Sequence, residues 1–202
     1  MAYNRKDHFY KRAKAEGKAS RAAFKIGQIQ KKYKIVEKGA TVVDLGAAPG
    51  GWMQELGKMV GKKGSVVGID KLPLHFHPED NMTFYLGDLQ GDDAINQLKF
   101  RLVTETADTV VCDMAPNTSG VGYADAYKSF ELANRAFEIC QDVLKEGGNF
   151  VVKIFPGKEN TELRANLKKC FRYVTTVVPP ATRKSSSEQY FVARGFKGTE
   201  TE

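Results

Sequence analysis

The sequence lacks long hydrophobic runs. No apolar stretch approaches the roughly 20 residues that a helix needs to span a bilayer. The N-terminus is positively charged, but no apolar segment follows it, so the pattern of a secretory signal is missing as well. We therefore expect a protein that does not enter a membrane.

Cysteine and histidine are scarce, with three residues of each. The cysteines are odd in number, far apart and surrounded by apolar residues, which is typical of reduced thiols in a cytosolic protein: Cys112, Cys140 and Cys170. His75 and His77 have no cysteine or third histidine near them, so we interpret them as part of a solvated loop. These residues predict a cytoplasmic protein without a metal site.

Acidic residues are nearly absent from the first 34 positions. Eleven basic residues there face only Asp7 and Glu16, a net charge of +9, whereas the whole chain carries +7 and the remainder is therefore slightly negative. Tyr3, Phe9, Tyr10 and Phe24 are interleaved with the basic residues. A solvated basic tail is one interpretation. The combination of concentrated charge and aromatic rings favours a polyanionic partner, most simply nucleic acid.

What the sequence does contain is a strand, a turn of small residues and a helix in succession, TVVDLGAAPGGWMQEL at residues 41–56. The apolar run at its start is typical of a buried parallel strand. The glycines would let the backbone approach a ligand closely, and apolar residues at helical spacing follow them. The pattern predicts the opening of a nucleotide-binding βαβ unit. A purely structural turn and a loosened dinucleotide fingerprint remain alternatives at this stage.

Three acids follow the apolar runs that we expect to be the next parallel strands. Asp70 ends the run 65–69, where an acid can accept both hydroxyls of an adenosine ribose, as found in both NAD and S-adenosylmethionine. Asp88 follows the strand predicted at 82–86 and would stand close to an adenine. Asp113 follows the strand predicted at 109–112, at the crevice where such sheets bind ligands.

Lys153 stands inside the apolar run FVVKIF at residues 150–155. Lysine is seldom fully buried without a partner, because removing an ammonium from water costs much free energy. A lysine at the strand end that reaches back to water is the simpler interpretation. Because Pro156 and Gly157 end the strand so soon, we favour a lysine that faces the crevice toward Asp113.

The remaining elements are predicted from local signals. Ser20 is interpreted as the N-cap of a helix that continues to Tyr33. A long helix is expected at 125–145, ended by Gly147 and Gly148. Shorter helices are expected at 92–102 and 160–171, and the last strands at 173–178 and 189–193, joined by the loop 179–187 with its basic and serine residues.

Taken together, these motifs resemble the FtsJ/RrmJ-like RNA 2′-O-methyltransferases, most closely the bacterial enzymes of the RlmE family that methylate a uridine ribose of the large-subunit ribosomal RNA. The resemblance covers nearly the whole chain and is carried by SRAAFK at 20–25, VDLGAAPGGW at 43–52, Gly87-Asp88, CDMAPNTSG at 112–120, FVVKIF at 150–155 and EQY at 188–190. It implies S-adenosylmethionine as cofactor and 23S ribosomal RNA as partner. We also expect the protein to be a monomer.

The same resemblance implies the fold and its boundaries. We expect an α/β protein with a single Rossmann-like methyltransferase domain, a seven-stranded, mostly parallel sheet whose last strand is antiparallel, and helices on both faces. The predicted boundaries are a basic N-terminal segment at 1–19, the methyltransferase domain at 20–198 and a C-terminal tail at 199–202.

The resemblance also implies the site residues. The family's catalytic Lys-Asp-Lys-Glu set falls on Lys25, Asp113, Lys153 and Glu188, and its cofactor contacts fall on Gly50, Trp52, Asp70, Asp88 and Asp113. In this chemistry a ribose hydroxyl loses its proton as it attacks a sulfonium methyl. Lys153 can act as the base only when neutral, which a nearby cation such as Lys25 promotes and Asp113 opposes. No metal is required.

Alternatives remain within and outside this family. A transfer RNA 2′-O-methyltransferase would share every motif. A nicotinamide-dependent oxidoreductase would share the glycine turn and Asp70, but it gives no reason for Lys153 or for the basic N-terminus. A non-catalytic RNA-binding protein would explain the charge but not the polar residues at the crevice.

Overall fold

The structure, a computed structural model, describes residues 8–91 and 93–198. Its described strands form a single seven-stranded sheet in the order β3-β2-β1-β4-β5-β7-β6. Only β7 runs antiparallel to its neighbours, which confirms the predicted sheet. The strands are β1 (Thr41–Leu45), β2 (Ser65–Asp70), β3 (Met82–Leu86), β4 (Ala107–Cys112), β5 (Leu144–Ile154), β6 (Phe171–Val177) and β7 (Gln189–Phe196).

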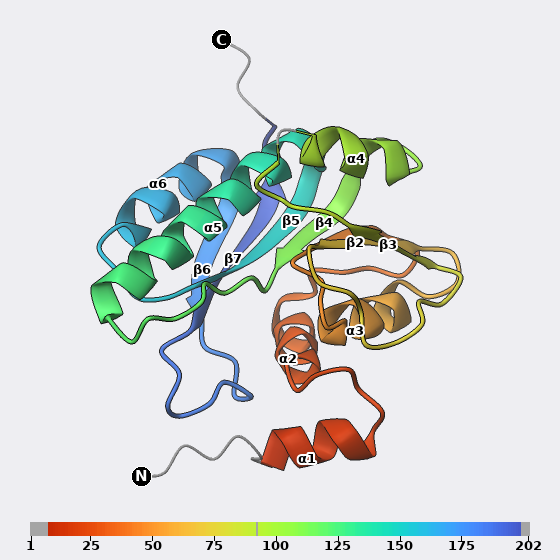
Figure 1. The fold of residues 1–202 in the computed structure, drawn as a ribbon. Coiled ribbons are helices and arrows are strands. Elements are labelled where there is room, and N and C mark those ends of the chain that lie inside the picture. The colour runs from red at the N-terminus through yellow and green to blue at the C-terminus, as the bar shows by residue number, and fades with distance from the viewer. Residues whose placement is uncertain (1–7, 92, 199–202) are drawn as a thin grey trace.

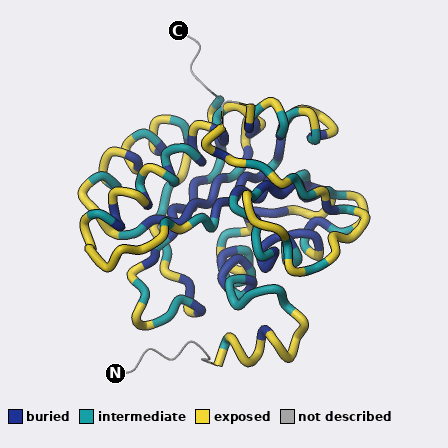
Figure 2. Tube along the Cα trace, viewed as in Figure 1, coloured by how far each residue is buried: buried dark blue, intermediate teal, exposed yellow. Residues whose placement is uncertain are grey.

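Helices cover both faces of this sheet, as the sequence predicted (Figure 1). On one face lie α2 (Ala23–Tyr33) and α3 (Gly51–Val60), with α1 (His8–Ala15) beyond α2. On the other face lie α4 (Ala94–Arg101), α5 (Gly122–Val143) and α6 (Asn160–Cys170). Figure 2 shows the strands between these two layers as the most deeply buried part of the chain.

Strand β1 illustrates why a continuous apolar run was needed. Val42 packs among the side chains of α2 and α3, whereas Val43 and Leu45 pack in the cluster formed with α4, α5 and α6. Successive side chains of a strand point to opposite faces, so a strand covered on both faces must be apolar at nearly every position. Asp44 is the exception in this strand, and it is also fully buried.

The strand order reverses between β1 and β4, which are paired in parallel with Leu45 opposite Cys112. The residues that follow the two strands, Gly46 and Asp113, are therefore neighbours. Ligands of open parallel sheets bind beyond the carboxyl ends of the strands at this kind of reversal. The fold thus places the glycine turn and the Asp113 loop at one crevice.

Two local predictions were wrong, and tertiary contacts explain both. Helix α2 begins at Ala23 with Ala22 as its N-cap, not Ser20. Ser20 instead lies against the start of α3, where its Oγ is 2.1 Å from the position that a Cβ on Gly51 would take. Gly147 and Gly148 do not end a helix, because α5 stops at Val143 and both glycines lie inside β5.

Pairing of β5 with β4 explains why Gly147 and Gly148 lie in a strand. Leu144 pairs with Ala107, and the register then shifts before Asn149 pairs with Thr109. Gly147 adopts a φ of 80°, a left-handed conformation that suits glycine at such an irregularity.

The N-terminal segment contains a helix that the sequence analysis did not predict. Helix α1 is held on α2 by Phe9, whose ring lies 5.4 Å from that of Phe24, and by Arg12, whose guanidinium lies 4.8 Å from the Phe24 ring. Arg5 and Lys6 of the basic segment, and the predicted tail at 199–202, lie outside the described residues.

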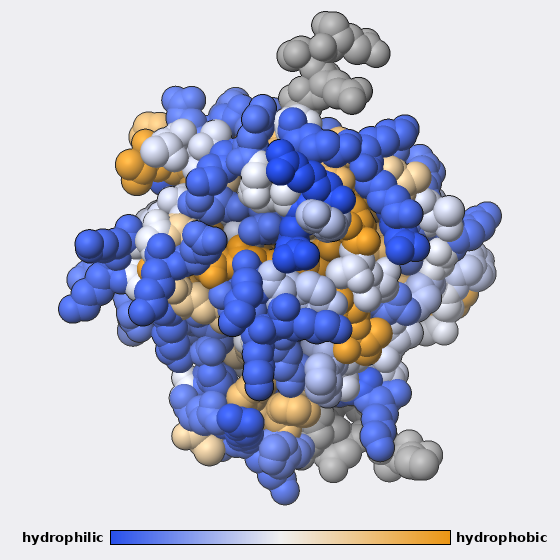
Figure 3. Space-filling model, turned by 180° about the vertical axis from the view of Figure 1, so that it is seen from behind, coloured by the Kyte–Doolittle hydropathy of each residue, from blue (hydrophilic) through white to orange (hydrophobic). Residues whose placement is uncertain are grey.

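The surface carries mostly hydrophilic side chains on the face shown in Figure 3, with hydrophobic side chains in small, separate patches. Across the described ranges, no helix combines the length and the apolar character that a membrane crossing requires. All three cysteines are thiols, and Cys112 and Cys140 are buried in the core.

Candidate active site

The turn after β1 is shaped by contacts that exclude larger residues. Gly46 has a φ of 78°, and a Cβ on it would lie 2.3 Å from Cγ of Met114. Gly50 is the N-cap of α3 with a φ of 107°, and a Cβ there would lie 2.2 Å from the Phe76 ring. The small residues therefore let the chain turn tightly against the loops that follow β4 and β2. The proposed cofactor contact of Gly50 stays a prediction.

A cavity of about 610 Å³ opens beside this turn. Its volume lies within the usual range for small-molecule sites. The three predicted acids share its wall with small turn residues and with apolar side chains: Gly46, Ala48, Asp70, Leu72, Asp88, Leu89, Asp113, Met114, Pro116 and Leu132 are among the lining residues. Apolar surfaces suit an adenine ring, and carboxylates suit hydroxyl and amino groups, so the cavity fits S-adenosylmethionine.

Two of these acids are oriented by backbone groups of their own loops. Asp70 accepts hydrogen bonds from the N–H groups of Ala48 (3.0 Å) and Leu72 (2.9 Å), so it links the end of β2 to the glycine turn. Asp88 accepts one from the N–H of Gln90 (3.0 Å). Both carboxylates thus have defined directions at the cavity wall, which is what recognition of an adenosine would require.

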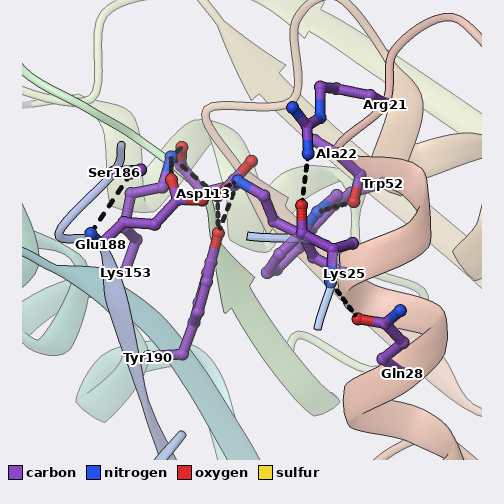
Figure 4. Close-up of polar contacts among 11 residues, drawn as sticks. Arg21, Ala22, Lys25, Gln28, Trp52, Asp113, Lys153, Ser186, Glu188 and Tyr190 are labelled. Carbon is purple, nitrogen blue, oxygen red and sulfur yellow. Dashed lines mark hydrogen bonds and ion pairs between the residues drawn. The ribbon is translucent and has the colours of Figure 1, made fainter. Parts of the chain in front are cut away.

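The four residues predicted as catalytic come together at the edge of this cavity (Figure 4). The Nζ of Lys153 lies 2.8 Å from Oδ1 of Asp113 and also donates to the Asp113 main-chain oxygen at 2.7 Å. Glu188 lies between the two lysines, with its carboxylate 2.6 Å from the Nζ of Lys25 and 4.0 Å from that of Lys153. The four side chains come from α2, the β4–α5 loop, β5 and the residue before β7, so only the tertiary fold unites them.

Tyr190 is a fifth member that the sequence analysis did not single out. Its hydroxyl donates to Oδ1 of Asp113 at 2.6 Å and accepts from the Nζ of Lys25 at 3.3 Å. A usable signal was present, because side chains two residues apart on a strand point to the same face, and Tyr190 stands two positions after Glu188. Tyr190 therefore ties the Lys25–Glu188 pair to the Lys153–Asp113 pair.

The electrostatics of the cluster favour the ionised forms of its central pair. Burial works against a charged Lys153, but the Asp113 carboxylate, its hydrogen bond and Glu188 outweigh it, so the pKa of Lys153 is raised above its ordinary value of 10.5. Burial likewise works against a charged Asp113, but Lys153 and Lys25 lower its pKa below 3.8. In the absence of a ligand, Lys153 is an ammonium paired with the Asp113 carboxylate. The sequence left open whether Lys25 or Asp113 has the larger effect on the pKa of Lys153. In the structure the effect of Asp113 is the larger one.

Asp44 is a second polar residue that the sequence analysis left without a role. It is fully buried in β1, and neither carboxyl oxygen has a hydrogen-bond partner among the residues that the structure describes. Burial raises the pKa of Asp44 well above 3.8, and the nearby charges of Asp113 and Asp70 raise it further. Its surroundings beneath the acids of the cavity therefore favour the protonated carboxyl group over the carboxylate. A polar residue inside a buried strand was the signal, the same one that drew attention to Lys153.

Trp52 lies in this region, but it has internal partners. Its indole N–H donates to the main-chain oxygen of Ala22 at 2.9 Å, and its ring stacks on Tyr190 with centroids 5.7 Å apart. The side chain thereby fixes α3 to α2 and holds the ring of Tyr190 in place. Its predicted cofactor contact stays a prediction.

The loop before β7 makes hydrogen bonds with α2 and with the residues just before that helix. The main-chain N–H of Ala181 donates to Oε1 of Gln28 at 2.8 Å, and the guanidinium of Arg21 donates to the Ala181 oxygen. The predicted loop 179–187 thus lies beside α2, at the carboxyl ends of the parallel strands (Figure 1).

Comparisons with known proteins agree with this geometry. The sequence profile of the FtsJ-like methyltransferases matches residues 19–196. The chain is 40% identical over 191 residues to "Ribosomal RNA large subunit methyltransferase E" of Halorubrum lacusprofundi, covering 95% of this chain and 71% of the relative. It is 41% identical over 192 residues to the protein of the same name in Stutzerimonas stutzeri, covering 95% and 92%.

A solved structure extends the comparison to three dimensions. A candidate ribosomal RNA methyltransferase from Plasmodium falciparum superposes with a TM-score of 0.78 at 29% identity, over 90% of this chain and 100% of that one. The range matched by the profile contains the whole sheet, the cavity and the four-residue cluster. The chain therefore belongs to the family of FtsJ-like methyltransferases.

Proposed function

We propose that this protein transfers a methyl group from S-adenosylmethionine to the 2′-hydroxyl of a uridine in the 23S ribosomal RNA of the large subunit, acting in the cytoplasm as a monomer. The observation that supports this most is the position of Lys153. It is buried between Asp113 and Glu188 at the edge of a cavity that fits the cofactor. Related proteins named for the large ribosomal subunit support the choice of RNA.

Each residue of the cluster has a proposed task. The bound cofactor supplies a methyl group on a positively charged sulfur. Lys153 accepts the proton of the ribose hydroxyl, after losing its own proton to solvent. Asp113 holds the Lys153 side chain in direction through its carboxylate and its main-chain oxygen. Lys25 and Glu188 complete the array, and the positive charge of Lys25 opposes the charged form of Lys153.

The cofactor acids are part of the same proposal. Asp70 would accept the ribose hydroxyls of the cofactor, and Asp88 would face its adenine. Both residues line the cavity with defined carboxylate directions. Much of the rate enhancement would come from holding hydroxyl, methyl and sulfur in line, because orientation alone can supply a large part of the barrier reduction.

Transfer of tritium from labelled S-adenosylmethionine tests the proposal. Large ribosomal subunits, free 23S RNA and transfer RNA from cells that lack the gene would be offered separately to the purified protein. We expect label in the large-subunit RNA, and nuclease digestion should place it on the ribose of one uridine. Label on a base or in transfer RNA would contradict the proposal, as would the absence of transfer to any RNA.

A further inference from the structure

A second hollow lies between the start of α5 and the chain that leaves β5 just after Lys153. It has a volume of about 740 Å³ and is lined by the first two turns of α5 and by the chain that leaves β5: Gly122, Tyr123, Ala126, Tyr127, Lys128, Glu131, Pro156, Gly157, Lys158 and Glu159 are among its lining residues. None of these residues belongs to the cluster or to the cofactor cavity.

Two tyrosines give this hollow its chemical character. Tyr123 is 83% exposed and Tyr127 is 50% exposed, which is unusual for large aromatic side chains. They stand four residues apart on α5, so they lie on one face of the helix. The ring of Tyr127 lies 6.2 Å from that of Phe130, which packs against the core. Tyr123 and Tyr127 therefore form an aromatic surface, and the contact with Phe130 holds the ring of Tyr127 in place.

Short contacts connect the walls of the hollow to the segment that carries Lys153. The N–H of Phe155, two residues after Lys153, donates to the hydroxyl of Ser129 on α5 at 2.9 Å. A Cβ on Gly157 would lie 3.1 Å from that of Ala126. The segment that carries Lys153 into the cluster thus forms one wall of the hollow directly afterwards.

The Asp113 side is connected as well. Asp125, in the first turn of α5, accepts hydrogen bonds from the N–H groups of Ser119 (2.7 Å) and Gly120 (3.1 Å). The loop that begins at Asp113 is therefore anchored on the same helical turn that carries Tyr123. A strand of RNA that presents a ribose to Lys153 would have its neighbouring nucleotides close to the tyrosines.

We propose that Tyr123 and Tyr127 form a stacking site for an unpaired nucleobase next to the methylated nucleotide. This inference rests on the proposed function, because it assumes that the ribose at Lys153 belongs to RNA. Proteins that bind single-stranded nucleic acid stack its bases on exposed aromatic side chains, because every base has a flat face. The lining lysines, Lys128 and Lys158, are matched by Glu131 and Glu159, so stacking rather than net charge supplies the attraction.

Binding of an in vitro transcript of large-subunit ribosomal RNA tests the site. Tyr123→Ala/Tyr127→Ala should weaken RNA binding by about 5- to 150-fold for each base that is stacked. Tyr123→Phe/Tyr127→Phe keeps both rings and should bind like the wild type. Phe100→Ala is the matched control, because Phe100 is 86% exposed on α4, away from the hollow. The slope of log affinity against log salt should not change, since no phosphate contact is lost.

Further measurements separate the possible results. Cofactor binding by calorimetry checks that the fold is intact, and so does the single Tyr123→Ala variant, because the Tyr123 side chain is largely exposed. Equal RNA affinity of the alanine variants and the wild type would overturn the stacking site and would point to a protein segment as the occupant. A loss of affinity accompanied by a flatter salt slope would overturn it too, because phosphate contacts would then be responsible.

Methyl transfer is measured on the same preparations. If the wild type transfers methyl groups but the tyrosines do not affect RNA binding, the proposed function stands and the stacking site is rejected. If RNA binding depends on the tyrosines while no methyl is transferred, the protein stacks a base at the tyrosines, but the proposed function and the position of that base next to a methylated nucleotide are both rejected.

Discussion

Lys153 presents an apparent conflict at the scale of single residues, because it is proposed as a base and yet is held as an ammonium. The Asp113 carboxylate raises the pKa of Lys153 above 10.5. A base in this state is available only in the small fraction of molecules that have lost the proton. The single-turnover rate should therefore rise with pH, about tenfold per unit, throughout the range below that pKa. A rate that is flat between neutral and mildly alkaline pH would contradict this prediction.

Two substitutions distinguish the charge of Lys153 from its proton. Lys153→Ala removes the base and should lower the single-turnover rate on the order of 10²- to 10⁴-fold. Lys153→Arg keeps the positive charge beside Asp113, but a guanidinium does not deprotonate at accessible pH, so the loss should be similar. Cofactor affinity serves as the control and should change little. An arginine variant with near-normal turnover would show that Lys153 does not act as the base.

Asp44 gives a prediction about stability, because burial and the nearby acids raise its folded-state pKa and favour the protonated carboxyl group. Such a group stabilises the fold fully below its ordinary pKa of 3.8, and this contribution is lost as pH rises toward the folded-state value. Asp44→Asn should abolish this part of the pH dependence. The difference in unfolding free energy between variant and wild type should grow with pH by up to about 1.4 kcal/mol per unit above pH 4.

Urea unfolding at several pH values measures that difference. A constant offset between the two curves is expected from the buried amide and does not affect the conclusion. Curves that stay parallel from acid to neutral pH would mean that Asp44 is ionised in the folded protein.

Asp70 connects the cofactor cavity to the glycine turn. Asp70→Ala removes the proposed acceptor for the cofactor ribose and should weaken S-adenosylmethionine binding by about 1–3 kcal/mol in calorimetry. Asp70→Asn is the matched variant, since it retains one oxygen for the N–H of Ala48. The cofactor affinity of the asparagine variant should lie between that of Asp70→Ala and that of the wild type. Unchanged affinity in both would mean that Asp70 only orders the turn.

At the scale of elements, the first turn of α5 and the loop before it behave as one unit. Asp125 accepts hydrogen bonds from the N–H and the hydroxyl of Ser119 and from the N–H of Gly120. Asp125→Ala leaves these donors without their acceptor and should speed amide exchange at Ser119 and Gly120 severalfold. Turnover should fall more than cofactor affinity, because the loop that begins at Asp113 is loosened. Unchanged exchange at both amides would count against this account of the loop.

The bounds of helices and strands were predicted correctly only where no contact with a distant part of the chain overrode the local sequence signal. The runs that became β1 and β2 were predicted within a residue of their observed bounds. The boundary between α5 and β5 was not, because pairing with β4 draws Leu144 into the sheet ahead of the glycines. The start of α2 was also missed, since Ser20 packs against Gly51 of a different helix.

At the scale of the whole molecule, the charge of the N-terminal segment has two parts. Lys18 and Lys25 are paired with Glu55 and Glu188, at 2.7 and 2.6 Å. Lys11 and Lys14 of α1 are exposed, on the side of the sheet where α2 presents Lys25 to the cluster. The exposed part of the charge is the part that RNA phosphates could meet.

Replacing Lys11 and Lys14 by glutamine tests this role. If both contact phosphates, the slope of log affinity against log salt should flatten by about 1.4–1.8 units, and every RNA sequence should be affected alike. Lys62→Gln/Lys63→Gln changes the charge equally in the turn between α3 and β2, and it should leave the slope unchanged. If the Lys11/Lys14 variant has the same slope as the wild type and the Lys62/Lys63 variant, RNA is held by another surface.

The sequence by itself predicted the architecture and drew attention to most residues of the candidate site. Apolar runs ended by acids or small residues predict buried parallel strands, and the carboxyl ends of such strands share one edge. Asp70, Asp88 and Asp113 could therefore be assigned to one crevice without coordinates. Lys153 was recognisable because an isolated ammonium in a buried strand requires a partner. The family motifs then supplied Lys25 and Glu188.

Only the tertiary structure decided which groups meet and in what state. The hydroxyl of Tyr190 reaches Asp113 because β7 enters the sheet antiparallel beside β5, with Tyr190 opposite Lys153. The protonation of Lys153 and of Asp44 depends on distances and burial that local patterns do not contain. Periodicity along a chain determines which face a side chain occupies. Its neighbours across the sheet are determined by strand order and register, which long-range packing alone selects.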